Sequence, residues 1–182
     1  ANDLLGSEHD GPIVARDTLA RFYRCPCCLG VLAARGDHLS CPQCQADYIA
    51  QPNRTVFAHG NGRRLYSSGD LSDEEIRTLA TRVAAHGWRS GLEAFLQELP
   101  IQRIPSVRAR LFFRHTAWRG LIDPLRRERA LVLDPGWGTL AVALSLEFQQ
   151  VHAILPSAEF AEIVSKRAED LGRANIAYLV VG

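Results

Sequence analysis

The sequence predicts an α/β fold in which a small metal-binding module and a helical segment precede a parallel sheet. Three observations predict it. All five cysteines lie between positions 25 and 44, a helix-capping pattern begins at Ser72, and apolar strands alternate with amphipathic helices from residue 130 onward. We therefore divide the chain into an N-terminal tail, the cysteine module, a linker, a helical segment and a partial Rossmann-like α/β domain, at 1–19, 20–58, 59–70, 71–129 and 130–182.

Two Cys-x-x-Cys pairs define the cysteine module. Cys25 and Cys28 form the first pair, and Cys41 and Cys44 form the second about a dozen residues later. Each pair turns two thiolates toward one point, and zinc favours a tetrahedron of four sulfurs. Because a closed four-sulfur site leaves no position for a reactive water, we predict a structural zinc ion held by these four cysteines.

The segment between the two pairs is predicted to form a hairpin. The runs Val-Leu-Ala at 31–33 and His-Leu-Ser at 38–40 flank the turn sequence at 34–37. Gly30, two places after Cys28, is expected to tolerate an unusual backbone angle. A module this small has too little core to fold alone, so metal binding would supply on the order of 10 kcal/mol of its stability.

Other uses of the cysteines stay open at this point. Cys27 or His38 could replace one of the four ligands, and the cysteines could instead form disulfides in an oxidising compartment. Redox catalysis by one pair is disfavoured, since no thioredoxin-like strand and helix surround it.

A boundary and a helical segment follow the cysteine module. Residues 53–70 are rich in Gly, Asn, Ser and Arg, which is typical of a linker. The pattern from Ser72 to Glu75 is a capping box. It precedes one apolar helical stripe, and a second short helix is predicted over 91–99. The stripe comprises Ile76, Leu79, Ala80, Val83 and Ala84.

Residues 106–129 interleave seven arginines with aromatic side chains. This pattern fits either a face for RNA or an acidic substrate, or an amphipathic helix with solvated arginines. We favour the amphipathic helix.

The last 53 residues alternate between strand and helix signals. Strands are predicted over 130–133, 151–155 and 176–181. One helix is predicted from residue 140, and another starts after Ser157 and stops at Gly172. Its predicted apolar face is Phe160, Ile163, Val164, Ala168 and Leu171. Strands that alternate with helices in this way are expected to pair in parallel.

The cysteine module and the last third of the chain each resemble a known protein family. The run from Tyr23 to Tyr48 resembles the zinc ribbons that activate methyltransferases, although Ala46 stands where a glycine is usual. Residues 133–138 and the strands and helices after them are similar to the opening of class I S-adenosylmethionine-dependent methyltransferases. That resemblance implies cofactor binding by Asp134, Gly136, Trp137 and Gly138.

The sequence departs from the methyltransferase pattern in three ways. Leu140 stands where the loop's third glycine is usual, or the loop is two residues short; Trp137 is bulky where the cofactor would approach; and Leu155 stands where an acidic residue usually binds the ribose hydroxyls. Glu159, one helical turn later, is a candidate substitute for that acid. We therefore expect this chain alone to be inactive, and no catalytic acid or base can be named.

Several functions remain as hypotheses. The chain is either a methyltransferase-like protein, a non-catalytic subunit that positions an active enzyme, or a zinc-ribbon RNA-binding module; a nicotinamide enzyme is the least favoured. A protein partner is expected at the ribbon or at an open sheet edge. The net charge of +1 gives no bulk attraction to nucleic acid, and no apolar run suits a membrane span, so a cytoplasmic location is expected.

Overall fold

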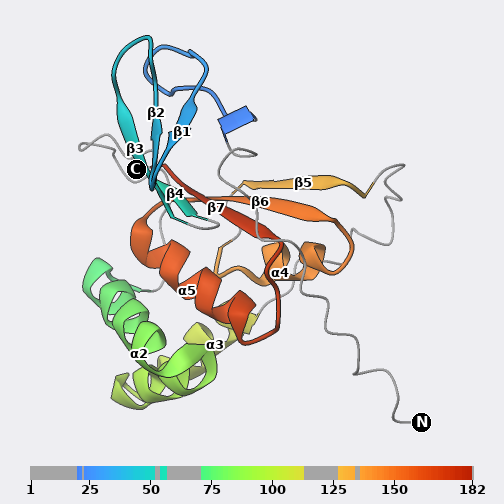
Figure 1. The fold of residues 1–182 in the computed structure, drawn as a ribbon. Helices are drawn as coiled ribbons and strands as arrows, with labels where there is room; N and C mark the ends of the chain where they lie inside the picture. The colour runs from blue at the N-terminus through green and yellow to red at the C-terminus, as the bar shows by residue number, and fades with distance from the viewer. Residues whose placement is uncertain are drawn as a thin grey trace.

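The computed structural model describes residues 20–21, 23–51, 54–56, 71–112, 127–133 and 136–181. Within these ranges, seven strands form one mixed sheet in the order β1-β2-β3-β4-β7-β6-β5. Figure 1 shows the strands of the cysteine module rising from one end of the sheet, with the helices beneath the parallel strands. The α/β class predicted from the sequence is confirmed.

The first four strands pair antiparallel. They are β1 (Ala33–Arg35), β2 (His38–Ser40), β3 (Asp47–Gln51) and β4 (Arg54–Val56). The turn between β1 and β2 contains Gly36 with a φ of 56°, a left-handed conformation that glycine adopts without steric cost. The predicted hairpin between the two cysteine pairs is thus confirmed. Its second strand has the predicted bounds, and its first strand lies two residues later than predicted.

The last three strands pair in parallel, as the alternating pattern predicted. They are β5 (Arg129–Leu133), β6 (Gln150–Leu155) and β7 (Ile176–Val180). The short strand β4 runs parallel to β7, with Thr55 opposite Leu179. The cysteine module is therefore continuous with the parallel strands, and one edge of these strands is paired within the chain. In the described ranges, β5 pairs only with β6.

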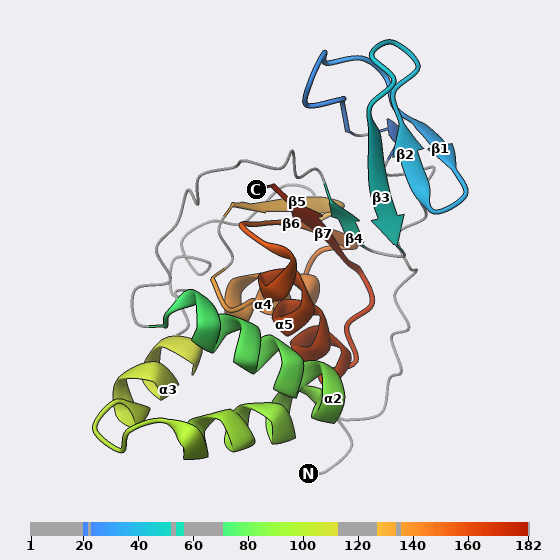
Figure 2. The same ribbon diagram turned by 90° about the vertical axis from the view of Figure 1, so that its left-hand side faces the viewer.

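Two helices cover one face of the parallel strands (Figure 2). They are α4 (Thr139–Ser145) and α5 (Ala158–Glu169). The side chain of Ser157 caps α5 by accepting a hydrogen bond from the backbone of Phe160 at 3.4 Å, as predicted. Gly172 follows the helix with a φ of 65°. Most of the predicted apolar face is buried, but Leu171 is exposed because it lies beyond the last helical turn.

The cysteine module covers part of the opposite face. Leu39, Tyr48 and Ala50 form one buried cluster with Ala177 and Leu179 of β7. Leu131 and Leu133 of β5 point from the sheet on the side away from the buried Val132, and they are 62% and 64% exposed. The module thus covers the β7 side of this face and leaves the β5 side open to solvent.

The helical segment consists of α2 (Asp73–Glu98) and α3 (Ile104–Phe112). The predicted capping box between Ser72 and Glu75 is present. Gly87 has a φ of 77° and a ψ of 170°, so it divides α2 into two halves. Asp170, after α5, accepts a hydrogen bond from the backbone of Arg89 at 3.2 Å and so caps the second half. The predicted helix over 91–99 is this second half.

Helix α2 packs on α5, and its predicted stripe is buried except for Ala84. Val107 and Leu111 of α3 are buried, while Arg108 forms an exposed ion pair with Glu93 at 3.0 Å. Of the arginine-rich segment, residues 106–112 therefore form part of an amphipathic helix, whereas residues 127–129 lead into β5; the residues between them lie outside the described ranges. Among the residues that the structure describes, no helix is long and apolar enough to cross a membrane.

Candidate metal centre

The first cysteine pair lies on a tight turn held by two backbone hydrogen bonds. The amide of Cys25 donates to the carbonyl of Gly30 at 2.9 Å, and the amide of Leu29 donates to the carbonyl of Cys25 at 2.8 Å. The left-handed residue is Leu29, with a φ of 61°, and not Gly30 as the sequence suggested. Gly30 instead lies close to the cluster: a Cβ there would be 2.7 Å from Oε1 of Gln43 and 3.2 Å from the sulfurs of both Cys28 and Cys41, so these side chains would have to shift.

The second pair repeats the same backbone turn. The amide of Cys41 donates to the carbonyl of Ala46, and the amide of Gln45 donates to that of Cys41, both at 2.9 Å. Gln45 is left-handed, with a φ of 62°. Ala46 occupies the place of Gly30, and because the left-handed residue of this turn is Gln45, the backbone does not require a glycine at position 46. The two turns together present four sulfurs to one point.

The four predicted ligands lie together. The sulfurs of Cys25 and Cys44 are 3.4 Å apart, those of Cys28 and Cys41 are also 3.4 Å apart, and all four lie within 4.8 Å of one another. Zinc–sulfur bonds of about 2.3 Å at tetrahedral angles require sulfur separations of roughly 3.8 Å. The cluster therefore has the size and donor set of a four-thiolate metal site.

The alternative ligands lie outside this cluster. Cys27 is exposed on the turn, and its sulfur is 3.6 Å from the hydroxyl of Tyr48. His38 pairs with the carboxylate of Asp37 at 2.5 Å. All five cysteines are free, so the structure contains none of the disulfides that the sequence had left open.

The pKa values of Cys25 and Cys44 are shifted in opposite directions. Burial raises the pKa of Cys25, but the hydroxyl of Tyr48 and the amides of Cys28 and Cys27 outweigh it and bring this pKa to about 6. The amide of Ala46 lowers the pKa of Cys44, but the hydrogen bond to Cys25 raises it, to about 12. Four thiols this close cannot all ionise without a cation, whereas a divalent metal ion would favour the loss of all four protons.

A second candidate site is the glycine loop that follows β5. Asp134 lies outside the described residues, so the structure gives no position for it. Gly136 has a φ of 56°, and a Cβ on it would have no atom within 4 Å. Gly138 has a φ of 81°, and a Cβ on it would lie 2.6 Å from a methyl group of Val164 in α5. Gly136 thus leaves the loop open to approach, while Gly138 lets α5 pack against it.

The side chain of Trp137 packs within the protein. Its ring stacks on Phe160 of α5, with 4.8 Å between the ring centroids. The buried guanidinium of Arg167 donates hydrogen bonds to the carbonyl of Trp137 at 2.9 Å and to that of Leu111 at 2.8 Å, and it lies over the ring of Trp88. The sequence analysis did not identify Arg167 as a buried residue. Its position on the apolar side of α5 was the one signal that could have indicated this.

The end of β6 offers no polar side chain to a ligand. Leu155 is completely buried among the apolar residues between the sheet and the helices. Glu159 is half-buried in the first turn of α5. The loop and the end of β6 therefore differ: Gly136 leaves open space at the loop, whereas Leu155 brings no hydrogen-bond acceptor to the end of β6.

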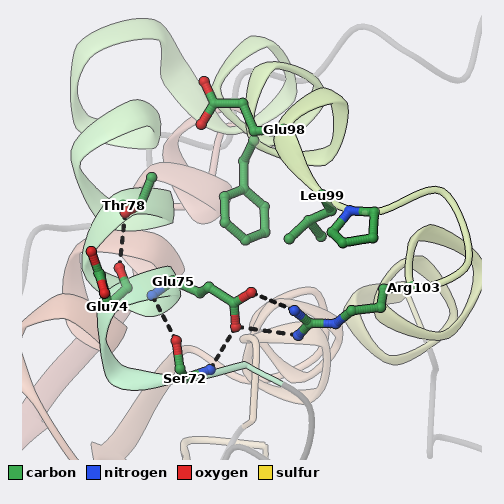
Figure 3. A pocket seen from close by; sticks show the side chains of 9 residues that line it. Ser72, Glu74, Glu75, Thr78, Glu98, Leu99 and Arg103 are labelled. Atoms are coloured by element: carbon green, nitrogen blue, oxygen red, sulfur yellow. Dashed lines mark hydrogen bonds and ion pairs between the residues drawn. The ribbon is translucent and has the colours of Figure 1, made fainter.

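An open pocket of about 470 Å³ lies within the helical segment (Figure 3). Its lining comes from both halves of α2, with its N-cap, and from the turn between α2 and α3. The lining residues are Ser72, Glu74, Glu75, Thr78, Phe95, Glu98, Leu99, Pro100 and Arg103. No sequence pattern predicted this pocket, because its walls are brought together by the reversal of α2 at Gly87.

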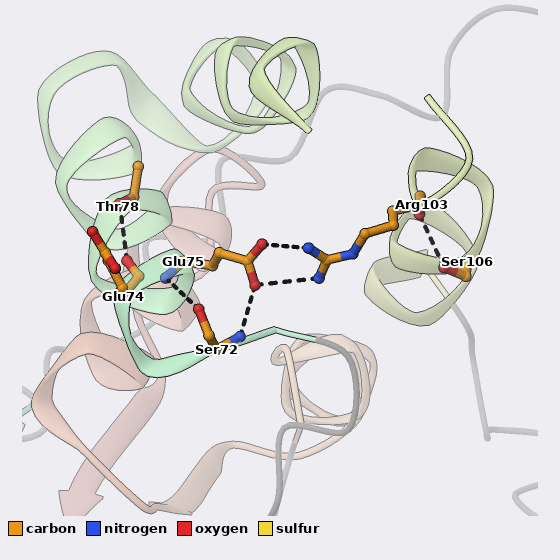
Figure 4. A network of polar contacts seen from close by, with 6 residues as sticks. All are labelled: Ser72, Glu74, Glu75, Thr78, Arg103 and Ser106. Atoms are coloured by element: carbon orange, nitrogen blue, oxygen red, sulfur yellow. Dashed lines mark hydrogen bonds and ion pairs between the residues drawn. The ribbon is translucent and has the colours of Figure 1, made fainter. Parts of the chain in front are cut away.

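Two of the three carboxylates that line this pocket are paired with arginines. Arg103 binds both carboxylate oxygens of Glu75, at 2.6 and 3.2 Å, and this contact lowers the pKa of Glu75 (Figure 4). Arg82 forms an ion pair with Glu98. These contacts join the two halves of α2 and the start of α3, so we interpret the polar network as structural.

Comparisons with known proteins give no further assignment. No protein-family model matches this chain, and no curated protein matches it.

Proposed function

We propose that Cys25, Cys28, Cys41 and Cys44 bind one structural Zn²⁺ ion. The observation that supports this most directly is the convergence of four sulfurs, without another ligand type, on one small volume. The centre would fix the two turns against each other and thereby hold the hairpin on the sheet. Analysis of the metal content of the purified chain tests this proposal, with one zinc per chain as the expected result.

We further propose that the α/β part is a domain of the class I methyltransferase type, which binds S-adenosylmethionine through the loop at 134–138. Parallel strands in the order β7-β6-β5, with a glycine loop at the carboxyl end of β5, support this proposal. The observation that carries it is Gly136, whose missing side chain leaves the loop open to a ligand.

The cofactor would be held less tightly than in a site with an acidic residue after β6. An unpaired, buried ribose hydroxyl costs about 1–3 kcal/mol, which corresponds to roughly 5- to 150-fold in affinity. Leu155 contributes no acceptor that would avoid this cost. We therefore propose micromolar binding and no methyl transfer by this chain alone.

Substitution of the open glycine tests the cofactor site. Gly136→Val would place a branched side chain where the cofactor must approach. Gly172→Val is the matched control, because Gly172 also has a positive φ and open space around it but lies at the end of α5. S-adenosylhomocysteine should raise the melting temperature of the wild type and of Gly172→Val, but not that of Gly136→Val. Equal stabilisation of all three proteins would contradict the proposal.

A second candidate function is a non-catalytic subunit that docks on an active enzyme. Two observations favour it: Leu155 lacks the acid that the cofactor needs, and β5 carries exposed apolar side chains beside an edge unpaired in the described ranges. Size-exclusion chromatography with light scattering tests this function. A monomer at all concentrations, with no co-purifying chain, would count against it.

A further inference from the structure

Tyr48 makes the two cysteine turns unequal. In each turn the first sulfur is bonded to two backbone amides and the last sulfur to one, so the backbone donors of the two turns match. The hydroxyl of Tyr48 adds a further contact, 3.1 Å from the sulfur of Cys25. Within the part of the chain that the structure describes, Cys41 has no such phenolic contact.

We propose that Tyr48 is a positioning residue of the metal centre, whose hydroxyl donates a hydrogen bond to the Cys25 thiolate. This inference rests on the proposed zinc site. A metal-bound thiolate has no proton to give, so the phenol must be the donor. Zinc with four thiolates carries a net charge of −2, and Cys25 lies completely buried, where each additional donor to sulfur lowers the cost of that charge.

The position of Tyr48 also joins the metal centre to the parallel strands. Tyr48 belongs to β3, its side chain is 2% exposed, and it packs in the same cluster as Ala177 and Leu179 of β7. The ring therefore cannot turn away to water without opening this cluster. Through this one side chain, the orientation of a metal ligand is linked to the contact between the cysteine module and the sheet.

Cys27 offers the competing acceptor. Its sulfur is 3.6 Å from the Tyr48 hydroxyl, longer than the contact to Cys25, and it lies on the solvent side of the turn. Because the contact to Cys25 is the shorter one, and metal binding keeps the Cys25 sulfur as a thiolate, Cys25 accepts the hydrogen bond from the Tyr48 hydroxyl.

Substitution of the tyrosine by phenylalanine tests this role. Tyr48→Phe removes only the hydroxyl, and the measurement is zinc affinity by competition with a chromophoric chelator. Tyr23→Phe is the matched control, since it removes a hydroxyl that contacts His152 of the sheet rather than a sulfur. Tyr48→Phe should weaken zinc binding by about 10-fold or more, the usual effect of losing an outer partner of a metal ligand, with Tyr23→Phe within about twofold of wild type.

The possible outcomes distinguish a failure of the proposed role of Tyr48 from a failure of the proposed zinc site. If wild type binds zinc and both variants bind it equally well, the role of Tyr48 is wrong while the zinc site stands. If both variants lose affinity to the same extent, the hydroxyls act on the fold and the role of Tyr48 is again wrong. If wild type binds no zinc, the zinc proposal itself fails and the inference fails with it.

A measurement on the wild-type chain tests the same hydrogen bond without any variant, and so does not depend on whether Tyr48→Phe folds. The protein is loaded with an NMR-active cadmium isotope, and scalar coupling between the metal and protons hydrogen-bonded to its sulfurs is recorded. The Tyr48 hydroxyl proton should show such coupling. Its absence, alongside visible coupling to the amides of Cys27 and Cys28, would overturn the inference.

Discussion

The hydroxyl of Tyr23 hydrogen-bonds to Nδ1 of His152, and so joins the cysteine module to the middle of the three parallel strands. The two rings meet edge to face, with centroids 5.7 Å apart. His152 is buried, and its neutral ring can accept the phenolic proton at Nδ1 when its own proton is on Nε2. Protonation of the imidazole would remove this acceptor.

This contact predicts a loss of stability in mild acid. Burial lowers the pKa of His152 below its ordinary value of 6.5, and the nearby charge of Arg129 lowers it further. The unfolded chain therefore takes up this proton at a higher pH than the folded chain does. The stability is complete above the unfolded pKa and declines as the pH falls below about 6.5 toward the folded pKa.

Urea unfolding at several pH values measures this effect. His152→Gln keeps a hydrogen-bonding side chain but cannot titrate, so the difference between wild type and variant isolates the histidine from acid release of the metal. That difference should shrink as the pH falls from about 7.5 to 5.5. A difference that is constant with pH would contradict the assignment.

Removal of one ligand should release the metal, whereas removal of Cys27 should not. Cys28→Ser is expected to lower zinc affinity by more than the roughly 10- to 100-fold typical of outer-partner substitutions. Cys27→Ser should retain one zinc per chain, because its sulfur lies outside the cluster. Metal analysis after dialysis measures both, and loss of zinc from Cys27→Ser would assign this cysteine to the site.

The two glycines of the loop should tolerate alanine unequally. Gly138→Ala adds a methyl group 2.6 Å from Val164 at a left-handed position, and both effects together should cost about 2–4 kcal/mol. Gly136→Ala meets no neighbour within 4 Å, so only the backbone cost of about 1–2 kcal/mol is expected. The free energy of unfolding in urea measures the two; equal losses would show that α5 does not pack on the loop as described.

Arg167 should stabilise the fold more than an exposed arginine does. Arg167→Met leaves the carbonyls of Trp137 and Leu111 without this donor, which predicts a loss of roughly 2–4 kcal/mol. Arg108→Met is the control, because its exposed ion pair with Glu93 should contribute less than about 1 kcal/mol. Thermal and urea unfolding of both variants would measure the difference, and similar losses would refute the role of the buried guanidinium.

Sequence spacing predicted the local elements well. The spacing of the two cysteine pairs indicated which four sulfurs lie together, because a metal site would constrain that spacing directly. The apolar periodicity around Ile163 and Val164 indicated the face of α5, since burial of one helix face requires that pattern.

Features that depend on distant neighbours were not predictable from the sequence. Strand β4 has three residues, too few for an alternating pattern, and it forms because the edge of β7 lies beside it. The capping of the second half of α2 by Asp170 joins residues far apart in the chain. Arg167 satisfies two carbonyls that only the folded chain brings together.

The most direct test of the central claim is a calorimetric titration of the zinc-loaded chain with S-adenosylhomocysteine, with NAD as the comparison. We predict micromolar binding of one S-adenosylhomocysteine per chain and no heat with NAD. The absence of detectable binding to S-adenosylhomocysteine, by a chain that retains its zinc, would contradict the assignment of the glycine loop as a cofactor site.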